Sequence, residues 1–246
     1  MKIYGLIGYP LSHSFSQAYF SEKFKKENIH DCRFDLFPLE QIKTFSLFIN
    51  QQQNLRGLAV TIPHKESILP FISELDEIAE EVNAVNCIAF NSSELKGYNT
   101  DVIGFEKSLQ PLLKAHHNKA IVLGAGGASK AVTYVLKKMG IDFIIASRGE
   151  IKNRQMISYE NIDDDLINEY KLIINCTPIG QFPNVDDSIS IPYNAVGKDH
   201  LFYDLIYNPT ETQFLKSAKS KGAVIKNGIE MLELQAEENW RIWNQS

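Results

Sequence analysis

The sequence contains few cysteines and no long apolar run. Its three cysteines are scattered, odd in number and without CxxC spacing, so they cannot form a disulfide framework and we expect a reducing compartment. No segment approaches the roughly 20 apolar residues that cross a bilayer, and the N-terminal segment lacks the sustained apolar stretch of a signal peptide. These absences predict a cytoplasmic protein without a membrane partner.

Basic charge is also in short supply. The chain of 246 residues carries 25 lysines and arginines against 30 aspartates and glutamates, a formal net charge of −5. A nucleic-acid partner needs a concentrated basic surface, so none is expected. The six histidines show no clear ligand spacing, and no metal is expected either. With 44% hydrophobic and 22% charged residues, the composition is that of a globular protein.

Short apolar runs alternate with stretches of helical periodicity, which predicts an α/β fold. In the first hundred residues we expect strands at 2–8, 32–39 and 55–63, and two short strands within 85–101. Helices are expected at 14–29, 42–52, 65–72 (with an interruption at Pro70) and 73–84. After Asp101 the pattern restarts with a helix at 102–113. Strands are then expected within 118–123, 142–148, 166–180 and 200–207, and a helix at 210–222 separates the last of them from the segment 223–228. Strands that alternate with helices predict a parallel, helix-covered sheet.

A glycine-rich turn follows the apolar strand at 118–123, in the sequence GAGGAS that starts at Gly124. Gly124 permits a tight turn, and Gly126 lets the backbone approach a pyrophosphate. Gly127 and Ala128 then open a helix whose N–H groups face that anion. Ser129 stands where a third Gly or Ala is usual, but it is small enough for close packing. The pattern predicts a dinucleotide site, with a purely structural turn as the alternative.

The strand at 142–148 ends on Ser147 and Arg148 rather than on an acid. An NAD enzyme is expected to carry an acid there, about 20 residues past the turn, for the ribose 2′-hydroxyl. A guanidinium can instead pair with a 2′-phosphate, and Lys152 adds a second cation, while Glu150 subtracts some of that potential. We therefore predict NADP as the cofactor, with a solvated surface arginine as the alternative.

Polar residues gather at the ends of three apolar strands in the first half of the chain, where an open α/β sheet binds ligands. The segments are Ser-His-Ser-Phe-Ser at 12–16, Val-Thr-Ile-Pro-His-Lys at 60–65 and Asn-Thr-Asp at 99–101. Each has a structural interpretation by itself. Serines 14 and 16 can cap a helix, Lys65 can be a solvated charge, and Asp101 can cap the helix that follows.

Taken together with the dinucleotide turn, these segments resemble the shikimate dehydrogenase family. Further motifs follow in the family's order: Ala-Val-Asn at 84–86, Asn-Cys-Thr-Pro-Ile-Gly at 175–180, Asp-Leu-Ile-Tyr-Asn-Pro at 204–209 and Gly-Ile-Glu-Met-Leu-Glu-Leu-Gln at 228–235. Any single motif could occur by chance, but the ordered set covers nearly the whole chain. The chain departs from the family at Ala59 and His64, where Asn and an aromatic are common, and in Ser-Arg-Gly at 147–149.

The resemblance implies a role for each matched residue. Lys65 and Asp101 would be the catalytic pair. The substrate-binding residues would be Ser14 and Ser16 for a carboxylate, and Thr61, Asn86, Tyr207 and Gln235 for the rest of the molecule. The dinucleotide would be bound by Gly124, Gly126, Gly127, Ala128, Ser147, Arg148, Lys152, Thr177 and Gly228.

The implied fold has two α/β domains. Residues 1–100 plus 228–246 would form a substrate-binding and catalytic domain completed by the C-terminal helix, and residues 101–227 a Rossmann-like NADP-binding domain. The implied reaction is the reversible NADPH-dependent reduction of 3-dehydroshikimate to shikimate in chorismate biosynthesis. Two alternatives stay open: an NAD-using quinate/shikimate dehydrogenase, and a non-catalytic shikimate or dinucleotide sensor. The expected oligomeric state is a monomer or a homodimer.

Overall fold

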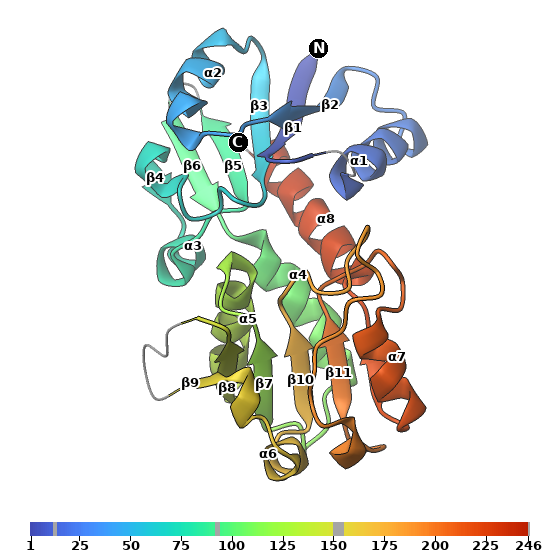
Figure 1. Ribbon diagram of the computed structural model, residues 1–246. Coiled ribbons are helices and arrows are strands. Elements are labelled where there is room, and N and C mark those ends of the chain that lie inside the picture. The colour runs from blue at the N-terminus through green and yellow to red at the C-terminus, as the bar shows by residue number, and fades with distance from the viewer. Residues whose placement is uncertain (12–13, 92–93, 150–154, 246) are drawn as a thin grey trace. The chain divides into compact units, whose positions relative to one another are not determined.

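The computed structural model describes residues 1–11, 14–91, 94–149 and 155–245, which fold into two compact units (Figure 1). One unit contains Met1–Ile103 together with Glu233–Ser246, and the other contains Gly104–Leu232. The division falls inside two helices, α4 (Thr100–Leu109) and α8 (Ile229–Gln245). The assignment of substrate to one unit and cofactor to the other stays a prediction.

A mixed sheet forms the centre of the first unit, with strands in the order β2-β1-β3-β5-β6-β4. The strands are β1 (Lys2–Gly8), β2 (Cys32–Pro38), β3 (Leu55–Val60), β4 (Glu74–Leu75), β5 (Cys87–Asn91) and β6 (Glu94–Tyr98). β1 runs parallel to β2 and β3, whereas β5 runs antiparallel to both β3 and β6. Besides the parts of α4 and α8 that belong to this unit, its helices are α1 (Phe15–Lys26), α2 (Phe45–Gln51) and α3 (Glu77–Val82).

Both faces of this sheet are covered by apolar side chains, and strand side chains alternate between them. In β1, Tyr4 and Leu6 belong to a core that α1 and α8 complete. Ile3 and Ile7 belong to a second core, completed by α2 and α3. Because β1 is buried on both sides, its sequence is a nearly continuous apolar run instead of an alternating one.

A parallel sheet forms the second unit, with strands in the order β12-β11-β10-β7-β8-β9. The strands are β7 (Lys119–Leu123), β8 (Asp142–Ser147), β9 (Met156–Ser158), β10 (Leu172–Asn175), β11 (Leu201–Asp204) and β12 (Val224–Lys226), and the helices are α5 (Gly127–Lys138), α6 (Asp164–Glu169) and α7 (Gln213–Ser220). α5 packs against β7 and β8, and α7 against β11 and β12. The predicted α/β fold with a Rossmann-like sheet is thereby confirmed. In the described part of the chain, no helix is both long and apolar enough to span a membrane.

Local predictions were wrong where a boundary depends on a single residue. In the segment 65–72 the expected interruption at Pro70 is confirmed, but the helix is missing: only a 3-10 turn forms at Leu69–Phe71, because Pro70 has no N–H to continue a helix. The helix expected at 73–84 is shortened to α3, since the Asp76 side chain accepts a hydrogen bond from Ala79 N at 2.8 Å and caps the helix there. The helix α6 takes the first residues of the segment 166–180, where only a strand was expected, and β9 was not expected at all.

The indole of Trp243 anchors α8 in the first core. Its ring stacks on Tyr4 with a centroid separation of 5.1 Å, and its Nε1 donates to Ile88 O at 3.0 Å. The indole lies over Gly57 of β3, where a Cβ atom would come within 2.3 Å of the ring. Glycine at position 57 is therefore what lets the helix approach the sheet.

Replacing Gly57 with alanine should destabilise the protein by about 1–3 kcal/mol, because the added methyl group overlaps a rigid indole and forces it off the sheet. Urea-induced unfolding followed by tryptophan fluorescence measures this loss. Gly197→Ala is the matched control, since no atom lies within 4 Å of a Cβ built at that position. Equal stability of the two variants would contradict this account of how Trp243 packs.

Candidate active site

The candidate catalytic residues lie at one edge of the first sheet. β1, β3 and β6 end at this edge, and β5 begins there because it runs antiparallel to its neighbours. Thr61 follows β3 directly and its N–H donates to Ile7 O at 2.9 Å, while Val85 N donates to Lys65 O at 2.7 Å. Backbone hydrogen bonds therefore join segments that are far apart in the sequence.

Lys65 and Asp101 form an ion pair at this edge. Lys65 Nζ lies 2.7 Å from Asp101 Oδ2, and the two side chains are 17% and 7% exposed. Asp101 lies in the first turn of α4, where the helix dipole favours a carboxylate. The two residues that the sequence predicted as a pair are thus brought together. An ammonium and a carboxylate that are largely removed from water can exchange a proton with a hydroxyl group placed beside them.

His64 anchors the loop that carries Lys65. It is buried, with Nε2 hydrogen-bonded to Leu39 O after β2 and Nδ1 3.4 Å from Ser67 Oγ. Since a carbonyl oxygen only accepts, Nε2 carries the proton. The sequence alone indicates no role for His64 beyond its position next to Lys65.

The side-chain amides of Asn86 and Gln235 meet next to Thr100, the residue before Asp101. Asn86 Nδ2 lies 3.4 Å from Gln235 Oε1, and Asn86 Oδ1 accepts a hydrogen bond from Thr100 N at 2.7 Å. All three side chains are buried. Asn86 and Gln235 were both predicted as substrate contacts, and the fold joins them across 149 residues of sequence. Thr100 was not predicted, although it lies inside the Asn-Thr-Asp motif.

The other predicted substrate residues are divided between the two units. Ser14 is the N-cap of α1, with Oγ 3.4 Å from Gln17 N, and Ser16 is half-buried in the first turn. Thr61 is half-buried after the end of β3. Tyr207 lies in the second unit, so the structure does not bring it together with the others within one unit.

The glycine turn of the second unit has the local geometry of an anion site. Gly124 has a φ of +104°, and a Cβ atom there would lie 2.8 Å from Thr177 Cγ2. Gly126 is the N-cap of α5, and no atom lies within 4 Å of a Cβ built on it, so the space beside it is open. Gly127 and Ala128 begin α5, where N–H groups have no partner within the helix. The residues present therefore fit a pyrophosphate.

Ser147 and Arg148 come at the end of β8, next to this turn. Gly124 N donates to Ala146 O at 2.8 Å, which joins the turn to the end of β8, and Ser147 Oγ accepts from Gly149 N at 3.1 Å. Arg148 is exposed, which leaves its guanidinium accessible to a ligand phosphate. The predicted second cation, Lys152, lies outside the described residues, as does Glu150.

A buried chain of polar groups holds the loop that carries Thr177. Asn175 Nδ2 donates to Asp204 Oδ1 at 2.9 Å, and Thr177 N donates to Asn175 Oδ1 at 2.8 Å. Thr212 Oγ1 donates to Asp204 Oδ2 at 2.6 Å. Burial of Asp204 raises the pKa of its carboxyl group from 3.8 to about 6. No individual role was predicted for Asn175 or Asp204, although each lies in a motif that resembles the family.

Gly228 marks a close approach of two backbone segments. A Cβ atom at this position would lie 2.1 Å from Leu205 O, and Gly228 N donates to Ile206 O at 3.0 Å. Glycine is therefore required here for packing. The role of Gly228 in binding the cofactor stays a prediction.

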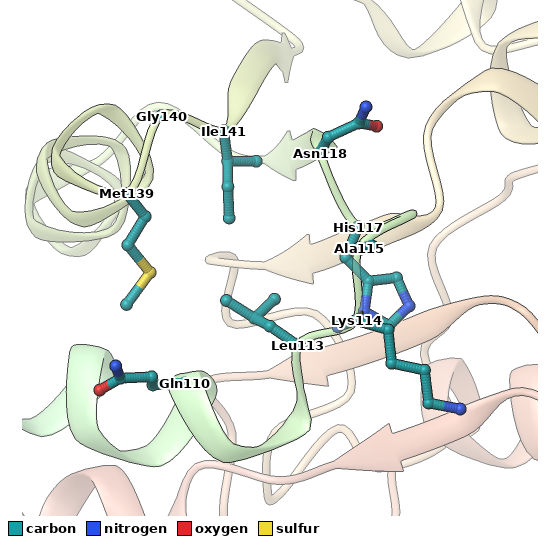
Figure 2. Close-up of a pocket in the computed structure, with 9 residues that line it drawn as sticks. All are labelled: Gln110, Leu113, Lys114, Ala115, His117, Asn118, Met139, Gly140 and Ile141. Atoms are coloured by element: carbon teal, nitrogen blue, oxygen red, sulfur yellow. Dashed lines mark hydrogen bonds between the residues drawn. The ribbon is translucent and has the colours of Figure 1, made fainter.

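A pocket of about 360 Å³ lies at the opposite edge of the second sheet from the glycine turn (Figure 2). It is lined by residues that precede β7 and β8, namely Gln110, Leu113, Lys114, Ala115, His117, Asn118, Met139, Gly140 and Ile141. Figure 2 shows the side chains of Leu113, Met139 and Ile141 facing the same space. Open parallel sheets bind ligands at the carboxyl ends of their strands, and this pocket lies at the opposite ends, away from the residues predicted to bind the dinucleotide.

The chain is similar to known proteins over nearly its whole length. Residues 6–88 match a family model described as the shikimate dehydrogenase substrate binding domain. Shikimate dehydrogenase (NADP(+)) of Methanosphaera stadtmanae is 37% identical over 94% of this chain and 87% of its own. The crystal structure of shikimate dehydrogenase from Aquifex aeolicus superposes with a TM-score of 0.87 at 32% identity, covering 100% of this chain and 93% of that one. Shikimate 5-dehydrogenase from Thermus thermophilus, in complex with NADP(H) and shikimate, gives a TM-score of 0.86 at 25% identity and coverages of 100% and 94%.

Thr212→Val removes a donor to Asp204 and should destabilise the protein more at pH 8 than at pH 5. The pKa of Asp204 is about 6 in the folded protein and 3.8 in the unfolded chain, so the folded protein binds this proton more tightly. Proton binding at Asp204 therefore stabilises the fold fully below pH 3.8, and this stabilisation is lost as the pH rises through 6. Above that pH the carboxylate is charged and depends on its donors. Loss of one donor there costs about 1–3 kcal/mol, whereas the protonated carboxyl group at pH 5 loses less.

Urea unfolding of the Thr212→Val variant at the two pH values measures this difference. The Thr212 hydroxyl also accepts a hydrogen bond from Leu215 N at the start of α7, but the loss of that cap is the same at both pH values. The pH comparison therefore isolates the contact with Asp204. An identical loss of stability at pH 5 and pH 8 would rule out a charged Asp204 that relies on Thr212.

Proposed function

The chain belongs to the shikimate dehydrogenase family, and from that premise we propose that it catalyses the reversible NADPH-dependent reduction of 3-dehydroshikimate to shikimate in chorismate biosynthesis. One observation carries the proposal for the chemistry: the 2.7 Å contact between Lys65 Nζ and Asp101 Oδ2. A protein that only binds a ligand has no need for a largely buried proton-transfer pair. We further propose that the protein is cytoplasmic, works as a monomer or a homodimer, and has no nucleic-acid partner.

Reduction of a ketone requires a hydride at the carbon and a proton at the oxygen, and bound NADPH supplies the hydride. The ammonium group of Lys65 donates a hydrogen bond to the carbonyl oxygen and stabilises the negative charge that develops there. Asp101 accepts from Lys65 and holds the hydroxyl group that forms. The proton that the ketone oxygen receives is supplied by Lys65 and Asp101 acting together, and it is not assigned to either residue alone.

Polar side chains of the first unit would fix the orientation of a ring that carries a carboxylate and several hydroxyls. Ser14 and Ser16 lie at the start of α1, where hydroxyl groups and the helix dipole together favour a carboxylate. Thr61, Asn86 and Gln235 would bind ring hydroxyls, and Tyr207 is a further proposed contact. Holding the reacting carbon in a single orientation lowers the entropic part of the barrier.

The second unit would bind the dinucleotide along the carboxyl edge of its sheet. Gly124, Gly126, Gly127 and Ala128 would bind the pyrophosphate at the start of α5. Ser147, Arg148 and Lys152 would bind the 2′-phosphate. Thr177 and Gly228 would lie against the nicotinamide half.

The assay that tests this function is NADPH oxidation with 3-dehydroshikimate, repeated with NADH and, in the reverse direction, with quinate in place of shikimate. Turnover with NADPH and 3-dehydroshikimate is the expected result. Equal rates with NADH and activity on quinate would instead identify an NAD-using quinate/shikimate dehydrogenase. Tight binding of either ligand without turnover would identify a sensor.

Replacing Lys65 or Asp101 with alanine should lower turnover by roughly 10²–10⁴-fold, because each change removes one half of the proton-transfer pair. The double variant should lose much less than the product of the two single losses, since the residues act as a unit. Lys26→Ala is the matched control, because Lys26 forms a 2.8 Å ion pair with Glu22 on the exposed side of α1. Near-normal turnover in either single variant would refute the pair.

Arg148→Ala should raise the KM for NADPH while leaving the KM for NADH almost unchanged, because only NADPH carries a 2′-phosphate. Steady-state kinetics with both cofactors measure the two constants. Arg33→Ala, which removes a guanidinium that pairs with Asp35 at 2.8 Å in the first unit, is the control. If both cofactors lose affinity equally in Arg148→Ala, Arg148 contacts another part of the dinucleotide.

A further inference from the structure

Asn239 lies one helical turn after Gln235 on α8 and is 1% exposed. Its Oδ1 accepts a hydrogen bond from Thr100 Oγ1 at 2.7 Å, and its Nδ2 donates to Gln235 Oε1 at 3.3 Å. Neither the sequence motifs nor the proposed mechanism uses this residue. A buried asparagine with both ends of its amide engaged is held in one orientation.

These contacts close a ring of four buried side chains. Asn86 Nδ2 donates to Thr100 Oγ1 at 3.0 Å and lies 3.4 Å from Gln235 Oε1. The Thr100 hydroxyl has a single proton and lies near two acceptors, Asn86 Oδ1 at 3.2 Å and Asn239 Oδ1 at 2.7 Å. It donates to Asn239, which is the closer of the two. The ring therefore runs from Asn86 through Thr100 and Asn239 to Gln235, which also accepts from Asn86.

The ring admits only one orientation of each amide. Thr100 N donates to Asn86 Oδ1 at 2.7 Å, so the nitrogen of Asn86 must face the hydroxyl of Thr100 and the oxygen of Gln235. Gln235 Oε1 accepts from two nitrogens, which turns its own amide nitrogen away from the ring. A reversed Gln235 amide would place donors against donors in a buried site, where unmatched groups are costly.

We propose that Asn239 is a positioning residue for substrate binding. Asn239 acts without being a catalytic residue. By accepting from Thr100 and donating to Gln235, it holds the oxygen of the Gln235 amide inside the ring, so that the nitrogen of this amide is the end presented to a hydroxyl of the substrate. The inference rests on the proposed function, in which Asn86 and Gln235 bind the ring of shikimate. It adds to that function a determinant of substrate affinity contributed by a residue outside the matched motifs.

The test is the kinetics of shikimate oxidation by NADP⁺ in the full-length Asn239→Leu variant. Leucine has a similar size and removes both polar contacts, so the KM for shikimate should rise about 10-fold, while kcat changes far less and the KM for NADP⁺ is unchanged. In a Gln235→Ala background the same substitution should add little, because it acts mainly through Gln235. Asn244→Leu is the matched control, since Asn244 is an exposed asparagine on the same helix.

A purely structural role for Asn239 would lower the unfolding midpoint and leave the KM for shikimate unchanged, and that result overturns the inference. An equal rise in the KM for NADP⁺ overturns it too. If Asn239→Leu does not fold, Asn239→Asp replaces it, because aspartate still accepts from Thr100 but cannot donate to Gln235; the same rise in KM is expected. If the wild-type protein does not oxidise shikimate, the proposed function fails and the inference with it. If the wild type is active and the variants keep its KM, only the inference fails.

Discussion

The largely buried ion pair between Lys65 and Asp101 is the interaction on which the arrangement of the first unit depends. Two charges removed from water are stable only when the backbone holds them at contact distance and their remaining polar neighbours are satisfied. His64 therefore bonds the loop that carries Lys65 to Leu39, the residue after β2. The backbone of Lys65 itself is held by a hydrogen bond from Val85 N. Asp101 is fixed from the other side, because α4 begins where Thr100 binds Asn86.

Helix α8 contributes to this site from the far end of the sequence. Trp243 fits against Gly57 in the first core, and Lys23 of α1 bonds to Glu237 at 2.9 Å. These contacts determine the position of α8 along its axis and its rotation about that axis. They place Gln235 and Asn239 on the side that faces Asn86 and Thr100. The packing of Trp243 near the end of α8 thus sets the hydrogen-bond geometry of Asn239 and Gln235, which lie one and two turns earlier in the same helix.

The second unit uses a similar arrangement for a different purpose. Asp204 is buried and accepts hydrogen bonds from Asn175 and Thr212, and Asn175 in turn holds the backbone of Thr177. The cost of burying a carboxyl group is visible in its raised pKa of about 6. The result is a loop of fixed shape against Gly124, where a side chain would clash with Thr177. Rigid loops at this edge leave less to be ordered when a dinucleotide binds.

The sequence by itself determined the local elements and the residues that carry the chemistry. Apolar runs predicted β1 and β7, and Ser14 and Ser16 were both candidates for the cap of α1, which Ser14 provides, because such signals depend on neighbours within a few residues. Lys65 and Asp101 were identified through the ordered set of motifs that resembles a known family. Tertiary structure alone decided which buried donor meets which acceptor. His64 and Asn239 have partners 25 and 139 residues away, and nothing near them in the chain indicates those partners. Periodicity specifies which face of a helix is buried, but the match of individual polar groups follows only once the helices and strands have packed.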